Sequence, residues 1–142
     1  MATTGLDVFD ATVQQTNVWL NEIAEAMHRE SRHEAYMALR ATLHALRDNL
    51  TVDEAADLAA QLPMLVRGLY YEGWDPSKTP ARDRSRDAFL ERVAGALERA
   101  QPDFPAEHAV RAVFATLSRH VSAGEIEEVR NALTRDIREL WD

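Results

Sequence analysis

RATLHALRDNLTVDEAADLAAQLPMLVRGLY, residues 40–70, decides the fold, because the chain repeats this stretch 71 positions later. The second copy, residues 111–141, reads RAVFATLSRHVSAGEIEEVRNALTRDIRELW. Several residues recur unchanged in one register, and many apolar residues are replaced by apolar ones, as when Leu43 becomes Phe114. An echo of this length indicates an internal duplication. We therefore predict two copies of one structural unit.

Apolar residues recur every three or four positions along both copies and in the segments that precede them. This period is typical of amphipathic α-helices. The first helix is predicted over residues 11–29, with Asp10 or Thr12 as its N-cap. Tyr36 in the second helix and Leu65 in the fourth belong to apolar faces that we expect to be turned inward.

Local signals mark where further helices begin. Three sites pair a serine or threonine with a glutamate three residues later, the spacing of a capping box. These boxes start at Ser31, Thr51 and Ser122. Proline suits the first turn of a helix, so Pro63 and Pro105 mark two more starts.

No segment shows the sustained alternation of a strand. We therefore predict an all-α fold of about eight helices, arranged as two tandem four-helix repeats. Residues 1–142 would form a single domain, with repeat one at 9–72, a turn-rich linker at 73–84 and repeat two at 85–142. A unit of about 60 residues is marginally stable alone, so the repeats should share one core.

The net charge of −8 is concentrated in residues 1–75, which carry twelve acidic and five basic residues. Such a surface repels phosphate backbones, so nucleic-acid binding is disfavoured. The chain has no cysteine, which suits a reducing compartment. We recognise neither a signal peptide nor an apolar run of the ~20 residues that a membrane span needs. We therefore expect a soluble cytoplasmic protein with no membrane partner.

Three stretches together resemble the bacterial domain of unknown function 2267. They are TNVWL at residues 16–20, ALRATLHALRD at 38–48, and AAQLPMLVRG with YYEGWDP at 59–76. The resemblance covers about Phe9 to Trp141. It implies an all-helical fold, and it implies no activity, cofactor or catalytic residue.

The candidate binding residues are Tyr70, Tyr71, Trp74, Arg67 and Arg138. The three aromatics crowd the start of the linker, and neighbours in sequence cannot share one helix face. They would form either a platform for a ligand or partner or a plug in the seam between the repeats. The two arginines occupy matching positions. They would form either an anion pocket or, as we favour, ion pairs with the repeated acids Glu54 and Glu125.

Two further sets of residues have weaker signals. Lys78, Arg82, Arg84 and Arg86 form a basic strip, which we interpret as a solvated helix start rather than a phosphate site. Glu25 and His28 have the spacing of di-iron bundles, but the second copy lacks this motif. We therefore predict no metal and no cofactor.

No constellation in the sequence identifies an activity, so three functions remain open. We favour a non-catalytic helical module that binds a protein, including a second copy of itself. The alternative is a binder of a small ligand or cofactor, or an enzyme, with a pocket between the repeats. A DNA-binding regulator is the third, and the acidic charge disfavours it.

Overall fold

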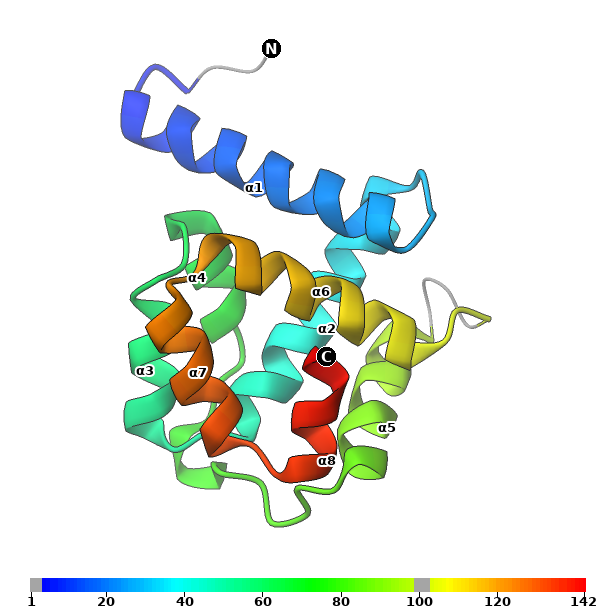
Figure 1. Ribbon diagram of the computed structural model, residues 1–142. Coiled ribbons are helices and arrows are strands. Elements are labelled where there is room, and N and C mark those ends of the chain that lie inside the picture. The colour runs from blue at the N-terminus through cyan, green and yellow to red at the C-terminus, as the bar shows by residue number, and fades with distance from the viewer. Residues whose placement is uncertain (1–3, 99–102) are drawn as a thin grey trace.

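The computed structural model describes residues 4–98 and 103–142, and every regular element in them is a helix, as predicted (Figure 1). The α-helices are α1 Asp7–Ala26, α2 Arg32–Asp48, α3 Val52–Ala59, α4 Met64–Tyr71, α5 Arg86–Leu97, α6 Ala106–His120, α7 Ala123–Ala132 and α8 Arg135–Arg138. The short 3-10 helices are η1 Pro76–Lys78 in the linker and η2 Glu139–Trp141 after α8. Met1, where a signal peptide would begin, and Pro102, where a turn was expected, lie outside the described residues.

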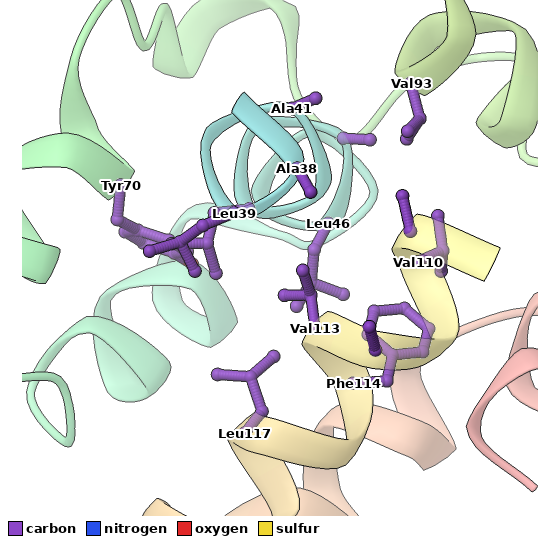
Figure 2. Packing of buried hydrophobic residues seen from close by; sticks show 14 of the residues in the cluster. Ala38, Leu39, Ala41, Leu46, Tyr70, Val93, Val110, Val113, Phe114 and Leu117 are labelled. Carbon is purple, nitrogen blue, oxygen red and sulfur yellow. The ribbon is translucent and has the colours of Figure 1, made fainter. Parts of the chain in front are cut away.

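Helix α2 lies at the centre of the molecule and packs against α1, α4, α5 and α6. Figure 2 looks along this helix: Leu39 meets Tyr70 on one side, and Leu46 faces Val113 of α6 on another. All four side chains are fully buried. Buried apolar residues of both halves thus form one cluster, which covers the long apolar surface of α2.

Helices of the two halves begin at matching positions. Thr51 and Ser122 are the N-caps of α3 and α7, and Pro63 and Thr134 are those of α4 and α8. The contacts also correspond: α1 packs on α6 while α5 packs on α2, and α3 packs on α7. A quasi-two-fold arrangement would produce these pairs. Superposition of the two halves stays a prediction.

Helix α1 begins at Asp7 rather than at residue 11, and neither predicted residue caps it. Its N-cap is Leu6, whose side chain makes no capping bond. The carboxylate of Asp10 instead accepts a hydrogen bond from the Thr4 amide, at 2.7 Å. Thr12 also has another role, in contact with α4.

The capping boxes differ between the halves. Thr51 and Glu54 form a complete box at the start of α3. At α7 the hydroxyl of Ser122 accepts from the Glu125 amide, but the Ser122 amide donates to Oε1 of Gln61, at 3.2 Å. A residue of the first half therefore completes the cap of a helix in the second half.

Candidate functional site

An apolar groove runs between α1, the start of α2 and α4, with a volume of about 790 Å³. We call it the α1–α4 groove. The apolar and aromatic residues that line it include Phe9, Val13, Tyr36, Met64, Leu65 and Tyr71. Sites that take small molecules or helices are commonly concave and apolar in this way.

One hydrogen bond joins the two main walls of the groove. Helix α4 follows Pro63, which offers no side-chain cap, so the first amides of α4 need other acceptors. The hydroxyl of Thr12 in α1 accepts from the Leu65 amide, at 2.9 Å. Helix α1 thereby serves as a cap for α4, and this contact sets the spacing of the walls.

Tyr36 and Leu65, which were predicted to face the core, lie open in this groove beside Met64. Met64 and Leu65 are 47% and 48% exposed, and Tyr36 is 38% exposed. The inward placement expected for Leu65 and Tyr36 was therefore wrong. Val66 and Tyr70 already fill the buried face of α4, so Leu65 lies on its other side.

The second half carries charged residues at the corresponding positions. Shifted by 71, Met64 becomes Arg135, Leu65 becomes Asp136, Gly68 becomes Glu139 and Tyr36 becomes Glu107. Arg135, Asp136 and Glu139 are exposed, and Glu107 pairs with Arg86 and Arg111. Matching helix positions thus accept charges in this same chain. Folding alone does not explain why the first half keeps them apolar.

The three candidate aromatics have different environments. Tyr70 is fully buried, and its hydroxyl donates to the Ala55 carbonyl at 2.9 Å, joining α4 to α3. Burial raises the pKa of this phenol, so it stays neutral. Tyr71 is half-buried, lines the groove and packs against Trp74, with ring centroids 5.2 Å apart. Of the three, only Tyr71 is placed where an occupant of the groove would touch it.

The arginines do not form the expected pairs with Glu54 and Glu125. Arg67 donates to the carbonyls of Ala59 and Leu62, both at 2.9 Å, and so ties α4 to the end of α3. Arg138 is half-buried on α8. Among the described residues, neither arginine has a carboxylate within 4.0 Å. Backbone carbonyls, which carry no sequence signal, take the guanidinium group of Arg67 instead.

Two residues of α2 hold the far end of the groove in place. Arg47 is 5% exposed, and its Nη1 donates to the carbonyls of Tyr70 and Glu72, at 2.8 and 2.7 Å. His44 donates from Nε2 to the Leu69 carbonyl, at 2.8 Å. Burial lowers the pKa of His44, an effect that this hydrogen bond opposes. Sequence reasoning missed both contacts, because their partners are main-chain oxygens.

A second cavity lies where α3 meets α7, with a volume of about 330 Å³. Glu54 and Asp57 line it from α3, and Glu125 and Glu128 line it from the matching positions of α7. Burial and the nearby charges of Glu128 and Asp57 raise the pKa of Glu125. We call these four residues the acidic seam, because their carboxylates repel one another across the two halves.

A family model described as an uncharacterized conserved protein, DUF2267, matches residues 16–140. The chain belongs to the DUF2267 family. No curated protein matches it. The part that is common to DUF2267 includes α2 to α8 and hence the Tyr36, Met64 and Leu65 walls of the groove. Phe9, Thr12 and Val13 precede the matched span, so the α1 wall of this DUF2267 protein is built largely outside it.

Among the described residues, no helix has both the length and the apolar character that crossing a membrane requires.

Proposed function

We propose that this DUF2267 protein is a non-catalytic interaction module of the cytoplasm, which binds an amphipathic helix of a partner protein in the α1–α4 groove. One observation carries the proposal: apolar residues line the groove where the second half has exposed charges at matching positions. Exposed apolar surface of this kind is typical of interaction sites. A helix that presents apolar residues three and four positions apart suits a groove between helices.

The net charge of the half that carries the groove supports a basic partner rather than a second copy. Residues 1–75 have a net charge of −7 by their twelve acidic and five basic residues. Two copies meeting through this half would bring like charges together, which is unfavourable. A helix with lysine or arginine beside its apolar face would be attracted to the same surface.

The test measures the binding of two designed helices by fluorescence anisotropy. Both carry leucines at i, i+3, i+4 and i+7; one has lysines elsewhere, and the other has glutamates. We expect the lysine helix to bind more tightly. The double variant Met64→Arg, Leu65→Asp, which installs the residues of the second half, should weaken this binding by about tenfold, because it removes two apolar contacts.

Val52→Asp is the matched control, because Val52 is an exposed apolar residue of α3 that does not line the groove. This variant should bind the lysine helix like the unchanged protein. Equal binding of both helices, or full binding by the double variant, would contradict the proposal. If the protein forms concentration-dependent dimers and the double variant does not, the occupant of the groove is a second copy of the chain rather than a partner protein.

A small apolar ligand is the second candidate for the same groove. Its volume of about 790 Å³ lies in the range of small-molecule sites. A thermal-shift series with medium-chain fatty acids tests this candidate. A rise in melting temperature that Leu65→Asp removes, without binding of either helix, would favour the ligand over the partner.

A further inference from the structure

A cavity of about 380 Å³ lies between the end of α2, the linker and α5, and it shares no lining residue with the α1–α4 groove. We call it the linker cavity. Six charged residues help to line it: Arg47, Asp48, Asp75, Lys78, Arg82 and Arg92. Four of these residues are basic and two are acidic. This local excess of positive charge contrasts with the net charge of −8 of the chain.

Both acidic residues already have partners within the protein. Asp48 accepts from Nε of Arg47, at 3.1 Å. Asp75 accepts from the amide and hydroxyl of Ser77, at 3.1 and 2.7 Å, and these bonds lower its pKa. Each carboxylate also pairs with one base of the cavity, Asp48 with Arg47 and Asp75 with Lys78, whose Nζ lies 3.8 Å from it. The positive charge that these pairs leave uncompensated is that of Arg82 and Arg92.

Arg47 is the buried member of the basic group. Its Nε and Nη1 are used in bonds to Asp48 and to two carbonyls of the α4 end. Among the described residues, Nη2 of Arg47 has no hydrogen-bond partner, and this atom is accessible to solvent. Because Arg47 lines the cavity, its two remaining N–H donors are available to an anion there.

Arg82 and Arg92 add charge from two other elements. Arg82 lies in the linker and Arg92 on α5, and both are exposed. In the part of the chain that the structure describes, neither forms an ion pair. The Ala81 amide donates to the Asp48 carbonyl at 2.7 Å, which fixes the linker, and hence Arg82, against the end of α2.

We propose that the linker cavity binds a small phosphate-bearing molecule, held by the guanidinium groups of Arg47, Arg82 and Arg92. Guanidinium groups form strong, charge-assisted hydrogen bonds with phosphate oxygens. The volume is at the lower end of the range of small-molecule sites. It therefore suits a phosphate with a small organic group rather than a polymer.

Isothermal titration calorimetry with inorganic phosphate and with glycerol phosphate tests this proposal at constant ionic strength. We expect saturable binding of glycerol phosphate, weakened at least fivefold in Arg82→Gln and in Arg92→Gln. These exposed residues can be changed without disturbing the core. The control is Arg84→Gln, which removes the same charge from a linker residue outside the cavity lining and should change the affinity less than twofold.

Two results would overturn the proposal. One is the absence of saturable binding for both probes. The other is an equal loss of affinity in Arg84→Gln, which would mean that net charge alone attracts the anion. The groove variant Met64→Arg, Leu65→Asp should keep its phosphate affinity, so this test and that of the proposed function fail independently.

Discussion

At the scale of single residues, contacts between side chains and main-chain oxygens hold α4 in place. Tyr70 bonds to the Ala55 carbonyl, Arg67 to the Leu62 carbonyl and Arg47 to the Glu72 carbonyl. Each joins α4 or its end to another helix or to the turn before it. The position of Tyr71 in the groove therefore depends on residues that do not line the groove.

Tyr70→Phe should lower the free energy of unfolding by about 0.5–1.5 kcal/mol, because it removes one buried hydrogen bond and leaves the Ala55 carbonyl without this donor. Urea denaturation measures the change. Tyr71→Phe is the matched control, since the Tyr71 hydroxyl has no hydrogen-bond partner among the described residues. An equal loss in both variants would mean that the ring environment, not this bond, determines the cost.

His44 should make the protein less stable in mild acid. Its folded-state pKa lies below its usual value, so the folded state binds a proton less readily than the unfolded chain does. Stability is therefore complete above the unfolded pKa of about 6.5 and is lost as the pH falls below it. His44→Gln keeps a donor for the Leu69 carbonyl and should flatten this part of the curve of melting temperature against pH. An unchanged slope would contradict the assignment.

At the scale of elements, helices differ in whether their own residues provide the hydrogen-bond partners of their N-terminal amides. Thr51 and Glu54 complete a capping box within α3. Helix α7 takes one acceptor from Gln61, and α4 takes one from Thr12. The last two are tertiary contacts, which a local sequence pattern cannot indicate.

Thr51→Ala should cost about 1 kcal/mol in the free energy of unfolding, because it removes the oxygen that accepts from the Glu54 amide. Thr134→Ala is the comparison: Thr134 is the N-cap of α8, and its hydroxyl makes no capping bond but donates to the Arg84 carbonyl at 2.9 Å, so this variant removes an exposed hydrogen bond and no cap. Chemical denaturation should show the smaller loss for Thr134→Ala. A reversed order would count against the capping interpretation.

Helical period and capping residues were sufficient to predict the all-helical fold, including the start of α3 at Thr51. They failed at α1, because its N-cap Leu6 is apolar and carries no capping signal. They also placed Leu65 inward, because an apolar residue beside Val66 looks like part of a core face. The signal that could have revealed the groove was the mismatch between the repeats, because Leu65 aligns with Asp136 and Met64 aligns with Arg135.

At the scale of the whole molecule, the contacts between the two halves include that of α2 with α6 and that of α3 with α7. The first contact is apolar, with Leu46 against Val113 (Figure 2). The second includes the acidic seam of Glu54, Asp57, Glu125 and Glu128. Attraction and repulsion between the halves therefore occur at different sites.

Glu125→Gln should stabilise the protein at neutral pH. The raised folded-state pKa means that the folded protein holds this proton more tightly than the unfolded chain. Stability is thus highest below the unfolded pKa of about 4.3 and falls as the pH rises through the folded value. Glu127→Gln, an exposed change on the same helix outside the seam, is the control. Melting curves between pH 4 and 8 that coincide for the two variants would exclude this role of Glu125.

The central place of α2 has a consequence for synthesis. The ribosome releases α2 long before α5 and α6, the helices that cover much of it, have been made. Until then the nascent first half presents an uncovered apolar stripe, and such surfaces attract chaperones and other unfinished chains. Slow translation of the residues that follow the linker would lengthen this vulnerable interval.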